Sequence, residues 1–150
     1  MLITAKRQHE ERKVEFMGCL LANVAFHAEI DEHLANWLIR MIDELSWMQL
    51  CLLSAVAQKG ETKLPDVEIG KSCGSWSSWG VHEQLTDLGF YKRGLICGQS
   101  ETQPPKLPVY DLSLAGQELT NRGRLLVEMA WLRRIDQSAI ALAIDLLESH

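Results

Sequence analysis

The residues of this chain that could carry out chemistry are its five histidines and four cysteines. None of them forms the closely spaced pairs that hold a catalytic or structural metal ion. Cys73, His82 and Cys97 could meet only through the fold, and three scattered residues rarely meet as ligands. The Gly-x4-Gly-Lys-Ser/Thr loop that cradles phosphates is also missing from the sequence. We therefore expect a protein that is not an enzyme and that holds no metal or cofactor.

A second set of side chains could contact nucleic acid. Four basic residues could hold phosphates if the fold brings them together, and two residues on the preceding helix could reach a phosphate and an adenine edge. These residues are Lys92, Arg93, Arg122, Arg124, His82 and Gln84. Glu83 and Asp87 are expected on the same outward face, where they would repel the DNA backbone. Because the net charge is −5, a solvated helix face is the simpler interpretation, and DNA binding is the alternative.

Two tryptophans are candidates for a protein contact. Trp76 and Trp79 lie in a Gly/Ser-rich stretch, where large aromatic side chains need a reason. They either fill the core beneath the next helix or form an exposed contact, because tryptophan is enriched at binding hot spots. Trp37, in contrast, belongs to the buried stripe of a helix. The acidic charge and these tryptophans favour a protein partner or a homo-oligomer.

The chain is expected to be a cytoplasmic protein with no membrane partner. Its four cysteines are far apart, and Cys19 and Cys51 lie in apolar stretches typical of small core residues. A reducing compartment is the simplest interpretation. No apolar run approaches the roughly 20 residues that span a bilayer, and the first ten residues lack the apolar core of a secretory signal.

Apolar periodicity predicts the helices that must position these residues. They cover residues 4–28, 30–45, 47–60, 78–88 and 121–148, the last with a break near Asp136. In the first helix, the buried face is expected at Val14, Met17, Leu21 and Val24, widened by Phe16, Leu20 and Phe26. In the second, it is expected at Ile30, Leu34, Trp37, Leu38, Met41, Ile42 and Leu45. Asp31 and Ser46 are predicted N-caps, and the third helix is apolar enough to lie centrally in the core.

Two short segments are predicted to pair as an antiparallel β-hairpin. They are residues 94–98 and 109–114, and the prolines between them would deter pairing with another sheet edge. A strand-to-helix junction follows, and the sequence offers two places for it, at Ser113 and at Thr120. We favour Thr120, because an unbroken apolar helix follows it.

The stretch Leu85–Leu126 resembles winged-helix domains. Such domains close on a pattern Y-x-L-[ST]-x-x-G-x-x-L, which is matched in "YDLSLAGQEL" and, in part, in "LTNRGRLL". The resemblance implies a DNA-reading helix before the hairpin. It departs from the family at residues 61–78, because Pro65 and two glycines make a poor helix where a compact one should precede the recognition helix.

The wider order of segments resembles an uncharacterised bacterial family linked to phage abortive infection, the Abi-alpha type. In that family a helical hairpin precedes a helix with "L-S-x-x-x-x-x-L", a helix with "LGLI" and a terminal "LT-x-x-G". The last three have counterparts in "ELSWMQLCLLSAV", "LTDLGFYKRGLI" and "LTNRG". These motifs describe packing and turns rather than chemistry. The resemblance implies a bacterial protein that takes part in phage defence.

The sequence as a whole predicts one domain, mainly α with a small antiparallel β-hairpin (α+β). A helical hairpin, residues 1–45, is expected to pack on a winged-helix-like unit, residues 46–126, and a C-terminal helix, residues 127–150, follows. The expected function is a non-enzymatic protein-interaction or oligomerisation module. A winged-helix DNA-binding transcriptional regulator is the alternative.

Overall fold

The computed structural model describes residues 2–59, 79–89, 92–98 and 117–148. Its elements follow the order α1 (Leu2–Phe26), α2 (Glu32–Glu44), α3 (Trp47–Ala57), α4 (Trp79–Leu88), β1 (Ile96–Gly98), β2 (Gln117–Leu119), α5 (Asn121–Met129), the 3-10 helix η3 (Leu132–Arg134) and α6 (Gln137–Glu148). The predicted fold class is confirmed: the protein is mainly α with a two-stranded antiparallel sheet. None of the described helices is both long and apolar enough to cross a bilayer.

Side-chain caps fix where the helices begin. The Asp31 carboxylate accepts a hydrogen bond from the backbone N–H of Leu34 at 2.8 Å, which confirms Asp31 as the N-cap of α2. The Ser46 hydroxyl accepts one from the N–H of Gln49, and the Gln49 side chain accepts one from the N–H of Ser46. This reciprocal capping box confirms the predicted start of α3, because it satisfies two donors that the first helical turn leaves without partners.

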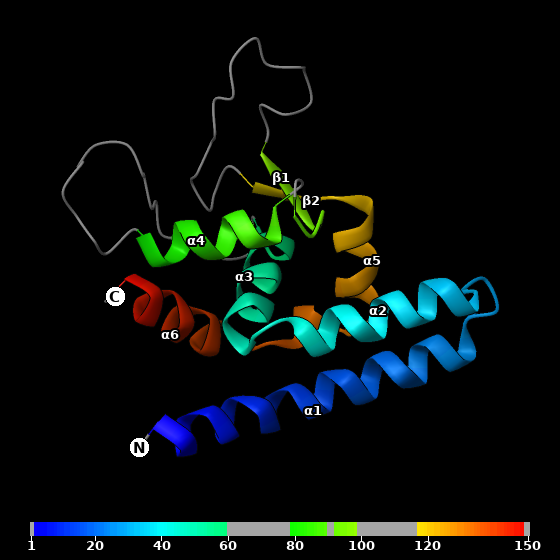
Figure 1. The fold of residues 1–150 in the computed structure, drawn as a ribbon, viewed down its shortest axis with the longest axis horizontal. Coiled ribbons are helices and arrows are strands. Elements are labelled where there is room, and N and C mark those ends of the chain that lie inside the picture. Colours follow the sequence, from blue (N-terminus) through cyan, green and yellow to red (C-terminus); the bar gives the residue numbers. More distant parts are fainter. Residues whose placement is uncertain (1, 60–78, 90–91, 99–116, 149–150) are drawn as a thin grey trace, which may run out of the picture.

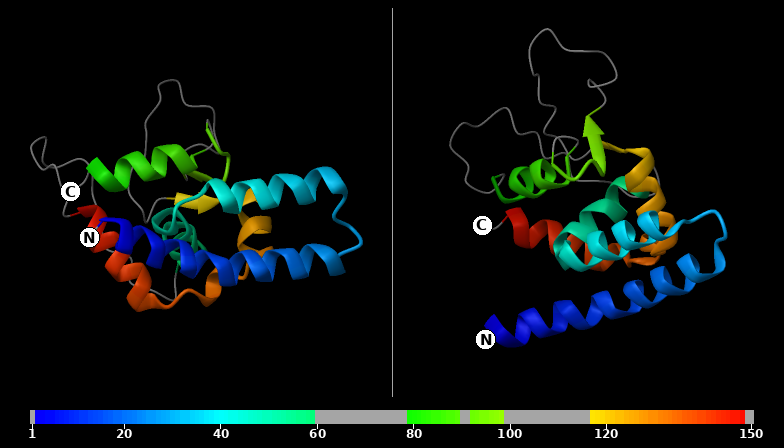
Figure 2. Two further views of the ribbon diagram at one scale, coloured as in Figure 1. Left: turned by 60° about the horizontal axis from the view of Figure 1, so that its bottom comes forward. Right: turned by 45° about the vertical axis from the view of Figure 1, so that its right-hand side comes forward.

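α3 lies in the centre of the molecule, as its composition predicts, and the other elements surround it (Figures 1 and 2). Its residues from Leu50 to Ala55 are all completely buried. α1 and α2 run antiparallel along one side, and α4 and the sheet cover another (Figure 1). One apolar core joins residues of α1 to α6 through α3.

The predicted buried face of α2 is confirmed, although Ile30, Leu34 and Trp37 are only partly buried against the core. Leu38, Ile42 and Leu45 are fully buried and Met41 is nearly so. Trp37 is only half-buried, and the Arg122 guanidinium lies 5.6 Å from the centre of its ring. The indole is therefore shared between the core and a cation at the surface.

The predicted buried face of α1 is partly wrong. Met17 and Val24 pack against the core as predicted, but three other predicted positions are exposed. Phe16 and Leu20 face the core, whereas Val14 is 68% exposed, Leu21 47% and Phe26 89%. α1 carries apolar residues on more than one side, and packing decides between them because Phe16 meets the Trp47 ring of α3 at 5.8 Å. Periodicity alone does not contain that contact.

The first strand of the sheet lies within the predicted segment, residues 94–98, but its partner strand differs from the predicted one. Ile96, Cys97 and Gly98 pair antiparallel with Leu119, Glu118 and Gln117, respectively. The predicted second strand, residues 109–114, lies outside the described residues. The pairing segment has weak strand propensity, but it leads straight into α5, and its alternation of a buried Gln117, an exposed Glu118 and a half-buried Leu119 fits one covered face of a sheet.

The strand-to-helix junction lies at Thr120, which confirms the favoured alternative. Its hydroxyl accepts a hydrogen bond from the N–H of Gly123 and donates one to the carbonyl of Gly94. The first turn of α5 is pressed against β1, because a Cβ added at Gly123 would lie 1.9 Å from the carbonyl oxygen of Leu95. Only glycine fits there.

The predicted break near Asp136 in the helix over residues 121–148 is confirmed, but the interruption begins earlier than predicted. α5 ends at Met129, and Trp131 has a left-handed backbone with φ 56°, which turns the chain into η3 before α6 begins just after Asp136. Buried side chains of α3 hold this turn. The Ser54 hydroxyl donates to the carbonyl of Leu132 at 2.6 Å, and Gln58 Nε2 donates to the carbonyl of Arg133 at 3.1 Å. These donors satisfy carbonyls that a continuous helix would have used itself.

Candidate interaction site

Arg93, one of the residues predicted to contact DNA, is engaged within the protein. Arg93 Nε donates to the Asp87 carboxylate at 2.8 Å, and its Nη1 donates to Glu44 at 2.9 Å. Gln49 Nε2 donates to the same Asp87 carboxylate at 2.6 Å. Asp87 was expected to face outward, but it instead ties α4 to α3 and to the turn that contains Arg93, so this expectation is wrong.

The electrostatics of these residues agree with their contacts. Burial of Asp87 opposes its ionisation, but the hydrogen bonds from Arg93 and Gln49 outweigh this effect and lower the pKa of Asp87. The hydrogen bond to Asp87 raises the pKa of Arg93 further above its usual range, against the opposing effect of burial. Arg93 stays charged, but the carboxylates of Asp87 and Glu44 offset its charge toward any ligand.

The other predicted site residues are placed as follows. Lys92, Arg122 and Arg124 are exposed, and Gln84 is half-buried on α4. Arg122 stacks on Trp37. Trp76 and the side chains of Trp79 and His82 lie outside the described residues. Because Arg93 is bound by carboxylates, three of the four predicted basic residues remain available to phosphates.

A residue that the sequence does not single out has the most unusual position. Trp131 has a left-handed backbone, and its side chain is 45% exposed. The Arg134 guanidinium lies 5.1 Å from the centre of its ring. The position directly after a helix in this conformation is normally glycine, because a side chain there costs roughly 1–2 kcal/mol. Bulky residues are held in such strain mainly at functional sites.

The indole borders a shallow hollow of about 370 Å³. We call its lining, Val127, Glu128, Trp131, Arg133 and Arg134, the Trp131 surface. Arg133 and Arg134 are exposed. The sequence gives one indication of this site. Trp131 does not belong to the apolar face formed by Leu125, Met129 and Leu132, and two arginines follow it closely.

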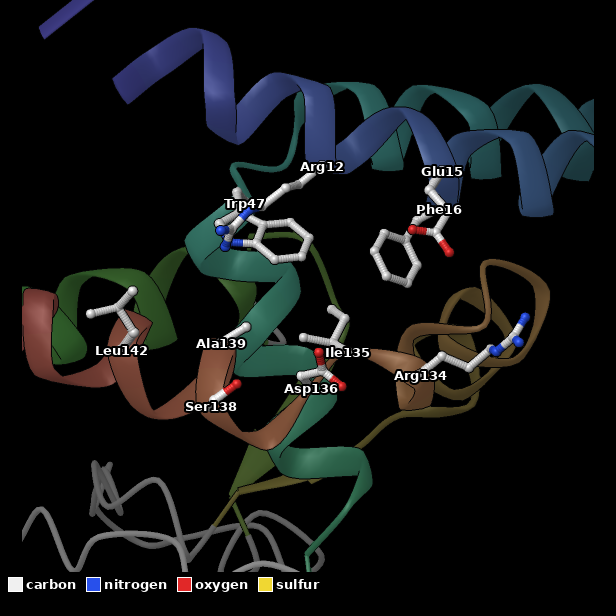
Figure 3. A pocket seen from close by; sticks show the side chains of 10 residues that line it. All are labelled: Arg12, Glu15, Phe16, Trp47, Arg134, Ile135, Asp136, Ser138, Ala139 and Leu142. Atoms are coloured by element: carbon white, nitrogen blue, oxygen red, sulfur yellow. The ribbon is translucent and has the colours of Figure 1, made fainter. Parts of the chain in front are cut away.

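A second depression, of about 560 Å³, adjoins the Trp131 surface and shares Arg134 with it. It lies between α1, the start of α3 and the start of α6, and we call it the α1–α6 cleft (Figure 3). Arg12 reaches down from α1 over the Trp47 ring, 5.8 Å from its centre, next to Phe16. The cleft therefore has an aromatic floor beneath an arginine.

The charged groups around the cleft balance, and the buried thiol of Cys51 is unreactive. Arg12 and Arg134 are accompanied by Glu15 and Asp136. Burial raises the pKa of Cys51 to about 12, against the opposing charge of Arg12. Because the thiolate is the nucleophilic form, Cys51 stays protonated and unreactive at neutral pH. The arrangement suits binding of an apolar or mixed surface.

The sequence contains one pattern typical of a catalytic serine, which runs against the prediction of a non-enzymatic protein. Residues 70–74 read Gly-Lys-Ser-Cys-Gly, which matches Gly-x-Ser-x-Gly. A nucleophile elbow also requires a strand before the serine and a helix after it. The segment lies outside the described residues, so the spacing carries no assigned role.

Comparison with known proteins identifies no relative. No family model, no curated protein and no solved structure matches the chain. The winged-helix and Abi-alpha resemblances therefore stay predictions.

Proposed function

We propose that this chain is a cytoplasmic, non-enzymatic protein-interaction module that binds its partner through the Trp131 surface and the adjoining α1–α6 cleft. The observation that carries the proposal is Trp131, an exposed tryptophan in a backbone conformation that favours glycine. Tryptophan and arginine are the residue types most enriched at binding hot spots. Trp131 and Arg134 supply both, already stacked on each other.

The test compares the size of the native protein with that of two variants. The tagged chain is expected to elute from a gel-filtration column as a species larger than a monomer, either in native cell extract or after purification. Trp131→Ala should return it to the monomer, whereas Val14→Ala, at another exposed apolar position, should not. A monomer in both preparations, or an unchanged complex in Trp131→Ala, would refute the proposal.

Duplex-DNA binding is the second candidate function. It is supported by the exposure of Lys92, Arg122 and Arg124. Phosphate contacts weaken as salt rises, because bound counterions are released when the protein binds. A DNA-binding protein should therefore shift a duplex at low salt and lose affinity in the Arg122→Ala/Arg124→Ala variant. The absence of a shift at low salt would remove this function.

The Abi-alpha resemblance suggests phage defence as the process in which the module acts. Cells that express the chain should then form fewer phage plaques than cells that express Trp131→Ala. Equal plaque numbers across a panel of phages would leave the binding module without this process.

A further inference from the structure

The turn between α1 and α2 carries an aromatic side chain surrounded by acidic residues. We call residues 26–32 the α1–α2 tip. Phe26 at its start is 89% exposed, and Glu29 and Glu32 are exposed as well. The sequence contains no lysine or arginine between Lys13 and Arg40, so no basic neighbour along the chain offsets these carboxylates.

The Trp131 surface has the opposite charge. Residues 120–135 contain four arginines and a single acidic residue, Glu128, although the whole chain has a net charge of −5. Arg133 and Arg134 are exposed beside the hollow. The molecule therefore carries one basic and one acidic surface that are complementary to each other, and complementary potentials steer association and fix its register.

The hollow has room for the aromatic ring of the tip. Its volume is about 370 Å³, whereas a dry cavity of roughly 150 Å³ already holds benzene. Phe26 of the same chain does not line it, and its high exposure shows that it contacts little of its own molecule. A second molecule can supply the ring.

The tip and the hollow lie at the same end of the molecule. Asn23 Nδ2 of α1 donates to the carbonyl of Met129 at the end of α5, at 2.7 Å. Phe26 lies three residues beyond Asn23, and Trp131 two residues beyond Met129. Because both surfaces lie at one end, two copies related by a two-fold axis can each insert a tip into the partner's hollow. The same contact then forms twice, and the assembly is a closed dimer.

We propose that the occupant of the Trp131 surface is the α1–α2 tip of a second copy of this chain, with Phe26 entering the hollow and Glu29 and Glu32 facing Arg133 and Arg134. This inference rests on the proposed protein-interaction function and names its partner. Burial of Phe26 against Trp131 supplies the apolar contact. The four charged positions set the register.

Charge reversal in two separate variants tests the pairing. One variant carries Arg133→Glu/Arg134→Glu and the other Glu29→Lys/Glu32→Lys. In each variant alone, like charges face each other, so both should sediment as monomers in analytical ultracentrifugation. An equimolar mixture should form a heterodimer, because the acidic tip of the first meets the basic surface of the second and the reversed tip meets the reversed surface. Failure of the mixture to associate would overturn the proposal.

The aromatic contact is tested against a matched position on the same helix. Phe26→Ser should weaken dimerisation roughly tenfold or more, the loss expected for a hot-spot residue. Val14→Ser also removes an exposed apolar side chain, about 18 Å along α1 from Phe26, and should leave dimerisation unchanged. Equal effects of the two substitutions would overturn the proposal. Matching circular dichroism spectra and thermal melts establish that the variants fold.

The outcome for the purified native chain separates this inference from the function on which it rests. A dimer that the two charge variants abolish and their mixture restores supports both. A purified chain that stays monomeric, but enters a larger, Trp131-dependent complex in cell extract, overturns the self-association and leaves the interaction function standing. A monomer under both conditions removes both.

Discussion

The first turn of α5 contains a glycine that is pressed against the sheet, and shortly after its end the chain has a tryptophan in a backbone conformation where glycine is usual. At Gly123 the carbonyl of Leu95 leaves no space for a Cβ. At Trp131 the backbone is left-handed with φ 56°, yet the residue carries a large, 45% exposed side chain. The start of the helix is therefore determined by packing within the chain. Its end is held in a left-handed turn by hydrogen bonds from Ser54 and Gln58 of α3, and the exposed indole at this turn is the basis of the proposed partner contact.

The largest effect on stability is expected at the N-terminal end of α5, where Gly123 packs against the sheet. Gly123→Ala should lower the free energy of unfolding by about 3 kcal/mol, because the added methyl group meets backbone rather than a movable side chain. Urea denaturation measures the difference. Gly18→Ala on α1 is the control, since its Cβ would have no atom within 4 Å, and it should stabilise by about 0.5–1 kcal/mol. Similar losses in the two variants would contradict the close approach.

Removal of the cap at the same end should have the next largest effect. Thr120→Ala deletes both the acceptor for the N–H of Gly123 and the donor to the carbonyl of Gly94. We expect a loss of about 1–2 kcal/mol in urea denaturation. Thr120→Ser keeps the hydroxyl and should retain most of the stability. If serine and alanine behaved alike, the hydroxyl would not be the stabilising group.

At the C-terminal end of α5, one side chain of α1 forms a hydrogen bond with the last turn of the helix. Asn23→Ala removes the donor to the carbonyl of Met129 and should cost about 1 kcal/mol in urea denaturation. Asn36→Ala, at an exposed position of α2, should cost less, because no hydrogen bond is lost there among the described residues. Equal effects would show that the Asn23 hydrogen bond adds no net stability.

The smallest effect is expected at Trp131, where, unlike at Gly123, glycine should give a more stable protein than alanine. Trp131→Gly should be more stable than Trp131→Ala by about 1 kcal/mol, because alanine keeps the left-handed strain and glycine relieves it. Both variants lose the stacking on Arg134, so their difference isolates the backbone. Thermal melts provide the measurement. An alanine variant as stable as the glycine variant would mean that the turn relaxes and stores no strain.

The helices could be predicted from the sequence to the extent that local signals determine them. The caps at Asp31, Ser46 and Thr120 are local hydrogen bonds, and the single apolar face of α2 has only one way to be buried. α1 has more than one apolar side, so its orientation depended on the meeting of Phe16 with Trp47. The strand Gln117–Leu119 forms because it pairs with β1, which its own residues do not indicate.

The candidate site was much less predictable. Arg93 looked like a phosphate ligand because its carboxylate partners come from separate elements, 6 and 49 residues away. Trp131 looked like one residue of a long helix, because the donors that break this helix, Ser54 and Gln58, lie on α3. Charge balance and backbone strain are both products of the tertiary structure, and no single segment reveals them.

The burial of Cys51 gives the protein an internal reporter of its own opening. A thiol that remains protonated inside the core cannot be alkylated until α3 is exposed to solvent. In a background where Cys19, Cys73 and Cys97 are replaced by serine, the rate of iodoacetamide labelling would then follow the fraction of molecules that are unfolded at any moment. Stability could in this way be measured in living cells, without denaturant.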